Sequence, residues 1–192
     1  MEDALTFGGA VISLQNHADR VKAACLAQLV NVIAPIMTET GGGVWRQTIF
    51  FPFAHMSNFG RGTVLRALVE SDTYKAAYSD PRGTVENIIP MPAVPYLKLA
   101  AVDNEGGGLT LFALNRDLAG EMKLDVAIRG FDGLAVREAS TLHDKDLKAA
   151  NTSEAKERVK PLALRGLNLS GRALSATLPP ASWNIIRLEA AH

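Results

Sequence analysis

The sequence predicts a mainly β protein in which an antiparallel β-sandwich follows a shorter helix–strand–helix segment. Three patterns support this fold class: an amphipathic run at residues 2–15, an almost unbroken apolar run at residues 21–30, and short alternating runs from about residue 65 onward. Short strands divided by turn residues at this spacing are typical of a sandwich. With 192 residues, the chain can bury roughly 70% of its unfolded surface if it is compact.

The first expected element is a helix from Glu2 to Gln15. Its apolar residues recur with i, i+3, i+4 spacing, and Glu2 and Asp3 place negative charge at the amino end, where the helix dipole favours it. Polar residues 16–19 then interrupt the pattern. This predicts a helix followed by a short turn.

The run Val21–Val30 has the composition of a strand buried on both faces, as in a parallel sheet. Cys25 lies inside it, and Gln28 lies near its carboxyl end, where α/β barrels gather binding and catalytic groups. A buried amide needs hydrogen-bond partners. For Gln28 these are either backbone groups or a ligand, and the sequence position alone leaves both open.

A loop is expected after this strand, at Pro35 and the glycines 41–43, followed by the aromatic-rich stretch 45–53. The stretch Pro52–Leu65 has the pattern of a second helix. Helix, strand and helix would form part of a repeated βα unit, and the chain begins without the strand that should precede them.

Seven alternating runs are expected as sandwich strands. They are Leu65–Val69, Leu97–Asp103, Leu109–Asn115, Met122–Arg129, Leu134–Leu142, Ala173–Leu178 and Trp183–Leu188. Turn residues separate them at 80–83, 104–108, 129–133 and 178–180. The Pro-rich piece 89–95 is expected to be extended, between sheets or along an edge, and residues 145–159 to form a charged surface loop with the sequon 151–153, which matters only in a secreted protein.

Composition narrows the function classes. Twenty Lys and Arg residues balance twenty Asp and Glu residues, so electrostatic capture of nucleic acid or an anionic membrane is not indicated. No apolar run reaches the ~18 residues of a membrane-spanning helix, and the amino end lacks the pattern of a signal peptide. The single cysteine excludes an intrachain disulfide. We therefore expect a soluble, cytoplasmic protein.

No motif indicates a metal or cofactor. The four histidines, at 17, 55, 143 and 192, do not have metal-ligand spacing, and the glycine runs 41–43 and 106–108 lack the residues of a phosphate loop. Asp144 and Asp146 beside His143 could form a calcium loop or an acid/base pair, but an exposed polar turn is the more common structure for such a group.

Three segments resemble the α-L-arabinofuranosidases of glycoside hydrolase family 51. These are Ala23–Ile36 with its core Ala-Gln-Leu-Val-Asn, the aromatic stretch Trp45–Phe53, and the terminal Leu178–Leu188. The resemblance extends over essentially the whole chain. It implies that residues 1–65 are the last part of a catalytic (β/α)8 barrel and that residues 66–192 are a carboxyl-terminal β-sandwich of jelly-roll type.

The resemblance also implies a reaction: retaining hydrolysis of terminal non-reducing α-L-arabinofuranosyl groups from arabinan, arabinoxylan or their oligosaccharides. Retaining hydrolysis uses two carboxyl groups. In the family both are glutamates, in Asn-Glu and Glu-Trp contexts on earlier barrel strands. This chain has no Glu-Trp, and its Asn104-Glu105 falls in a turn. We therefore expect no catalytic residue in this chain and no activity from it alone.

In the family, the glutamine matching Gln28 hydrogen-bonds the arabinose, and an amide suits this because it both donates and accepts. Trp45 could wall the sugar site, although tryptophans after glycine runs are more often loop anchors. Asn31 points to the opposite face of the strand and is expected to cap the following turn. Glu39 is expected to be a solvated loop charge.

The family forms oligomers, so a homo-oligomer is implied for the full-length protein, together with the missing amino-terminal barrel portion as partner. The competing hypothesis is a non-catalytic carbohydrate-binding or assembly module. Such a sugar platform needs exposed aromatic residues on its strands, and residues 67–182 contain only three Tyr and two Phe.

Overall fold

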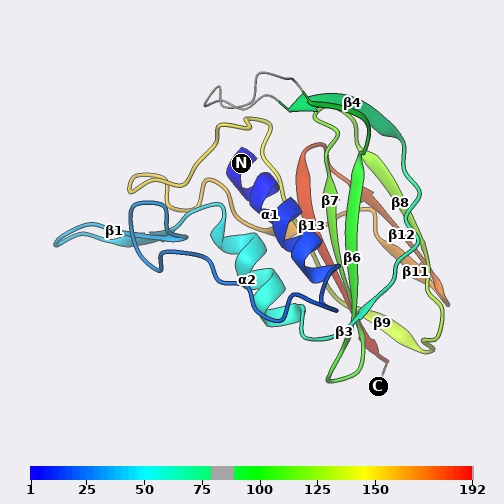
Figure 1. The fold of residues 1–192 in the computed structure, drawn as a ribbon. Helices are drawn as coiled ribbons and strands as arrows, with labels where there is room; N and C mark the ends of the chain where they lie inside the picture. Colours follow the sequence, from blue (N-terminus) through cyan, green and yellow to red (C-terminus); the bar gives the residue numbers. More distant parts are fainter. Residues whose placement is uncertain (79–88, 192) are drawn as a thin grey trace.

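The computed structural model describes residues 1–78 and 89–191. Two helices cover one face of a six-stranded antiparallel sheet, and a three-stranded sheet covers the other face (Figure 1). The helices are α1 (Glu2–Gln15) and α2 (Phe50–Phe59). The fold class predicted from the sequence, mainly β with antiparallel sheets, is confirmed.

The six-stranded sheet has the order β10-β9-β13-β7-β6-β3. Its strands are β3 (Gly62–Leu65), β6 (Leu97–Asn104), β7 (Leu109–Asn115), β9 (Leu134–Leu142), β10 (Leu162–Ala163) and β13 (Ser182–Ala190). The three-stranded sheet has the order β11-β12-β8, formed by β11 (Asn168–Ser170), β12 (Ala173–Leu178) and β8 (Met122–Ala127). Because layers cover both faces of the large sheet, its central strand β7 is buried at every residue.

Residue parity along the strands assigns side chains to two separate cores. On β7, Phe112 and Leu114 face the helices, whereas Leu109, Leu111 and Ala113 face the small sheet. The two-residue period of a strand sends successive side chains to opposite faces. A strand covered on both faces therefore loses the apolar–polar alternation of a half-exposed strand and reads as continuously apolar.

Helix α1 packs closely on the sheet at Gly8. A Cβ atom at this position would lie 2.6 Å from Cε3 of Trp183, which is fully buried on β13. The lack of a side chain at Gly8 thus lets the helix backbone approach the indole ring. A Cβ atom added at the adjacent Gly9 would lie 3.2 Å from a methyl group of Leu114.

Most sequence predictions for the sandwich are confirmed. The helix Glu2–Gln15 and the strands Leu109–Asn115, Leu134–Leu142 and Ala173–Leu178 have the predicted bounds. The other predicted strands shift by one to a few residues: Leu97–Asp103 extends to Asn104, Met122–Arg129 ends at Ala127, and Trp183–Leu188 extends to Ser182 and Ala190. Residues 145–159 contain no helix or strand, as expected. The predicted turn at 80–83 lies outside the described residues, as does His192.

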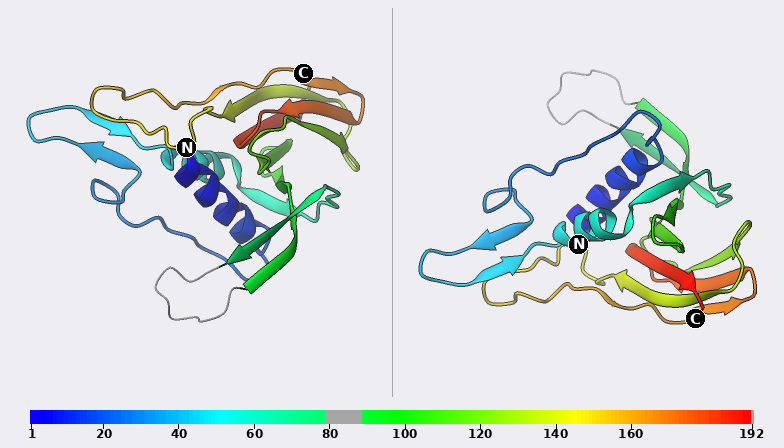
Figure 2. Two further views of the ribbon diagram at one scale, coloured as in Figure 1. Left: turned by 90° about the horizontal axis from the view of Figure 1, so that it is seen from above. Right: turned by 90° about the horizontal axis from the view of Figure 1, so that it is seen from below.

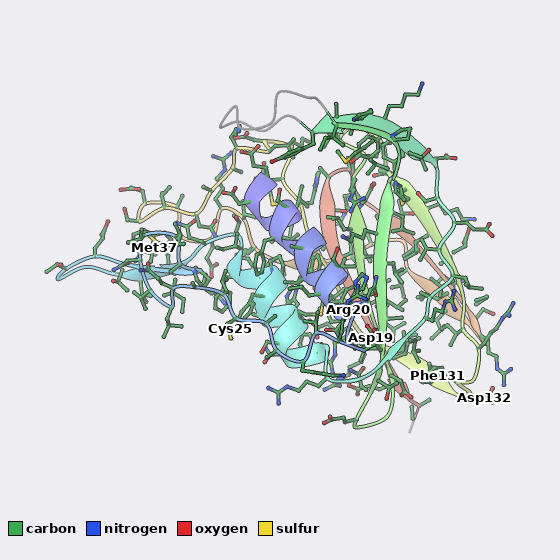
Figure 3. The ribbon with its side chains drawn as sticks, viewed as in Figure 1. Asp19, Arg20, Cys25, Met37, Phe131 and Asp132 are labelled. Carbon is green, nitrogen blue, oxygen red and sulfur yellow. The ribbon has the colours of Figure 1, made fainter. Side chains whose placement is uncertain are left out.

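The predicted buried strand Val21–Val30 is not formed in this structure. This segment is an irregular, mostly exposed loop, whose last residue makes an isolated bridge to Ile36. Cys25, predicted to be buried, is exposed on this loop, outside both sheets (Figure 3). A strand of this kind is held by hydrogen bonds to neighbours on both sides, and the described residues provide only the single bridge at Val30.

Two other boundaries are also corrected. The second helix spans Phe50–Phe59 rather than Pro52–Leu65, because Gly60 ends it and Gly62 starts β3. The predicted strand Leu65–Val69 is coil beyond Leu65, with Leu68 86% exposed. The order of elements before residue 66 is thus helix, loop, hairpin, helix and strand rather than helix, strand and helix.

Two short hairpins lie outside the main sheets. In the first, β1 (Ile36–Thr38) pairs with β2 (Val44–Arg46) around the glycine turn, and this hairpin projects away from the sheets (Figure 2). In the second, β4 (Thr73–Tyr78) pairs with β5 (Ile89–Pro95), the Pro-rich piece. The expectation that this piece is extended is confirmed. β1, β2, β4, β10 and β11 were not expected from the sequence, because they are short or lack clear alternation.

Candidate functional site

The loop that carries Gln28 is exposed and apolar. Gln28 itself is exposed, the peptide bond that precedes it is cis, and its side chain makes no hydrogen bond to other described residues. Its neighbours include Leu29, 73% exposed, Val32, 80%, and Ile33, 66%. Of the two alternatives for the amide, satisfaction by backbone groups is therefore not found within the described residues.

Asn31 forms the turn that follows. Its Oδ1 accepts a hydrogen bond from the backbone N–H of Thr38 at 2.7 Å, and its Nδ2 donates to Oγ1 of Thr38 at 3.0 Å. Its φ of 64° lies in the left-handed region, which Asn tolerates better than most residues. The prediction that Asn31 caps the turn is confirmed.

Trp45 is anchored to a distant loop. It lies half-buried on β2, and its indole Nε1 donates to the carbonyl of Asn151 at 3.2 Å. Asn151 is only 2% exposed and uses its own amide to bond the backbone on both sides: Nδ2 donates to the carbonyls of Arg46 and Val159, and Oδ1 accepts from the N–H of Val159. The sequon asparagine is thus a structural bridge between two loops.

Asp144 and Asp146 belong to a polar turn held by Arg158. Asp144 and Asp146 both lie close to the guanidinium of Arg158, and each accepts a hydrogen bond from a nearby backbone N–H. The N–H of Lys148 and the Arg158 side chain lower the pKa of Asp146. These contacts are those of a polar turn, the more common of the structures considered for this group. Within residues 1–78 and 89–191, no cluster of three or more His, Cys, Asp or Glu residues could hold a metal.

Glu39 lies at the exposed turn of the β1–β2 hairpin, where its carbonyl accepts a hydrogen bond from the N–H of Gly42 at 3.0 Å. The expectation of a solvated charge there agrees with its exposure. The hairpin projects away from the sheets, with Met37 on β1 marking its place (Figure 3).

A buried titratable contact was missed by the sequence reasoning. Nδ1 of His55, on α2, accepts a hydrogen bond from the indole Nε1 of Trp183 at 3.0 Å. Burial lowers the pKa of His55 to about 4, against the opposing effect of the Glu138 carboxylate. The imidazole of His55 stacks on the Phe59 ring, and the guanidinium of Arg187 lies over that Phe59 ring, 4.2 Å from its centroid. Because residues 55 and 183 lie far apart in the sequence, no local pattern could have indicated this pair.

The fold places the chain among antiparallel β-sandwich domains with helices packed on one sheet. Residues 1–182 match the α-L-arabinofuranosidase C-terminal domain family, and the chain belongs to this family. The resemblance to family 51 arabinofuranosidases predicted from the sequence is confirmed.

Several relatives are similar over nearly the whole chain. An intracellular exo-α-(1→5)-L-arabinofuranosidase from Streptomyces lividans is 46% identical over 186 residues, covering 96% of this chain and 26% of the relative. A Bacillus subtilis enzyme described in the same words is 42% identical over 190 residues, covering 98% of this chain and 35% of the relative. The chain thus spans about a quarter to a third of the length of these relatives.

A solved structure shows the same fold. The structure of a family 51 α-L-arabinofuranosidase from Bifidobacterium longum aligns with a TM-score of 0.84 and 34% identity, covering 98% of this chain and 35% of that one. The helices, the projecting hairpin and the sandwich therefore form a unit that also occurs within a longer protein.

No helix in the described part of the chain is long and apolar enough to cross a membrane.

Proposed function

We propose that the chain acts as the carboxyl-terminal portion of a retaining exo-α-L-arabinofuranosidase that removes terminal arabinofuranosyl groups from arabinan or arabinoxylan oligosaccharides. The observation that carries this proposal is the family match over residues 1–182. The names of the relatives, which describe intracellular exo-acting arabinofuranosidases, support the reaction class and a cytoplasmic location.

In this proposal the catalytic carboxyl groups come from a barrel portion outside these 192 residues. Retaining hydrolysis requires two carboxyl groups about 5 Å apart on opposite sides of the scissile bond. The acidic pair closest in sequence to a histidine, Asp144 and Asp146, is instead held by Arg158. The chain alone is therefore expected to be inactive.

We further propose that residues 21–30, a loop in this structure, form the last strand of that barrel when its neighbouring strands are present. Leu29 on this segment, and Val32 and Ile33 just after it, are 66–80% exposed, whereas fully burying one such side chain contributes ~1.5–3 kcal/mol. Neighbouring strands would provide both the burial and the missing hydrogen bonds. Residues 1–65 would then close the barrel, and residues 66–192 would form the sandwich.

Gln28 is proposed to bind the arabinose, because its amide is free of described partners and lies on this segment. Trp45 is the second candidate for a sugar contact, on the part of its ring that the bond to Asn151 does not involve. A homo-oligomer is proposed for the full-length protein.

The test is a chimera in which residues 1–192 replace the matching region of the Bacillus subtilis relative. The chimera should hydrolyse p-nitrophenyl α-L-arabinofuranoside, and the purified 192-residue chain should not. Activity from the 192-residue chain alone would contradict the placement of the catalytic groups. A folded but inactive chimera would contradict the assignment of the chain to this role.

Within the chimera, Gln28→Ala should weaken transition-state binding by about 1–3 kcal/mol, the range for a lost buried hydrogen-bond partner. Gln15→Ala is the matched control, because the Gln15 amide donates to the carbonyl of Gly60 and should affect stability only. An unchanged kcat/KM for Gln28→Ala would exclude Gln28 from the site.

A further inference from the structure

A pocket with both apolar and charged lining residues lies between α1 and the sandwich, away from the loop that carries Gln28. It encloses about 550 Å³, and its walls include Lys98 of β6, Arg116 at the end of β7, and Tyr74 of β4. The small side chains of Gly9 and Ala10 on α1 leave this space open. Its lining therefore combines two cations with an aromatic side chain.

Neither cation has a carboxylate partner among the described residues. The ammonium of Lys98 donates to Oγ of Ser13, and Nη1 of Arg116 donates to the carbonyl of Pro95 at 3.1 Å. Burial lowers the pKa of Lys98, and the positive charge of Arg116 lowers it further. An anion in the pocket would relieve both the partial desolvation and the repulsion.

The one acidic side chain in the lining is already paired. Oε1 of Glu2 lies 2.6 Å from Nζ of Lys148. Glu2 therefore does not neutralise Lys98 or Arg116, and the charge that faces the pocket remains positive on the side of β6 and β7.

Tyr74 adds an apolar surface beside these charges. Its ring packs on that of Tyr96, with centroids 4.9 Å apart and planes inclined by 40°. A pyranose ring can pack on an aromatic side chain while its carboxylate reaches a cation.

We propose that this pocket binds a carboxylate-bearing sugar, a hexuronate unit of an acidic saccharide, with its carboxylate on Lys98 and Arg116 and its ring against Tyr74. The site is separate from the proposed arabinose site and does not depend on the hydrolytic activity. Its role would be to hold an acidic side group of a saccharide on the sandwich.

The test measures binding of glucuronate to the 192-residue chain from NMR chemical-shift changes at low ionic strength. Glucose serves as the neutral comparison. Glucuronate should bind at least about tenfold more tightly than glucose, since charge-assisted hydrogen bonds are roughly twice as strong as neutral ones. The preference should decrease as salt is added, because salt screens charges that are partly exposed. Equal binding of the two sugars would overturn the proposal.

Lys98→Met should abolish this preference, whereas Lys75→Met, an exposed neighbour of Tyr74 on the opposite face of β4, should retain it. If circular dichroism shows that the Lys98→Met variant does not fold, Arg116→Gln provides the same test. Tyr74→Leu should weaken glucuronate binding without changing acetate binding. If acetate or phosphate binds as tightly as glucuronate, the pocket is a simple anion site and the proposal of a sugar ligand is wrong.

Discussion

Acidification should destabilise the fold through the contact between His55 and Trp183. The indole N–H donates to Nδ1 of His55, so this nitrogen must carry a lone pair and the proton of the neutral ring is on Nε2. Protonation of Nδ1 would place two donors against each other in a site where the imidazole is largely buried. The folded state therefore disfavours the charged ring.

The sign and size of the effect follow from the pKa. Folding lowers the pKa of His55 from 6.5 to about 4, so above pH ~6.5 both folded and unfolded states are neutral and stability is at its maximum. As the pH falls below ~6.5, the unfolded state takes up a proton first, and the free energy of unfolding decreases by ~1.4 kcal/mol per pH unit. At about pH 5 the loss is ~2 kcal/mol, and the decrease levels off below about pH 4.

The assay is urea denaturation followed by circular dichroism at several pH values between about 7.5 and 4.5. His55→Asn is the informative variant, because Oδ1 of asparagine can accept the indole hydrogen bond and does not titrate. Its stability should fall less steeply with acid than that of the wild type. The difference between the two profiles removes the contribution of carboxylates, which both proteins share.

The exposed His17→Asn serves as the control and should keep the wild-type profile. Parallel profiles for the wild type and His55→Asn between about pH 6.5 and 4.5 would refute the argument. They would show that the Trp183 contact does not oppose protonation of His55.

Two further predictions concern packing and loop anchoring. Gly8→Ala should lower the free energy of unfolding by ~1–3 kcal/mol through overpacking against the buried Trp183 indole, although alanine gains up to ~1 kcal/mol in helix propensity. Gly9→Ala is the control, because it has the same gain in helix propensity and a milder contact. Equal stability of the two variants would contradict this reasoning. Asn151→Ala should lower the free energy of unfolding by ~2–4 kcal/mol, because it leaves buried backbone groups without hydrogen-bond partners. Asn168→Ala, at an exposed position, is the control and should stay within ~0.5 kcal/mol of the wild type in the same denaturation assay.

The candidate site was only partly predictable. The role of Asn31 followed from a local preference, since Asn favours the left-handed turn conformation that it adopts here. The anchor of Trp45 at Asn151 and the pocket at Lys98 could not be foreseen, because each joins residues that are distant in sequence. The sequence identified Gln28 through a family motif, and its sugar contact remains a prediction.

The sequence by itself determined the sandwich and the first helix. Strands such as 109–115 and 134–142, and the helix 2–15, have the predicted bounds because hydrophobic spacing and flanking turn residues are local signals. The same spacing could not fix the state of residues 21–30, which are apolar enough for a buried strand and yet lie exposed. Tertiary structure decided that outcome, because a strand buried on both faces exists only where neighbouring strands supply its hydrogen bonds and covering layers remove its side chains from water.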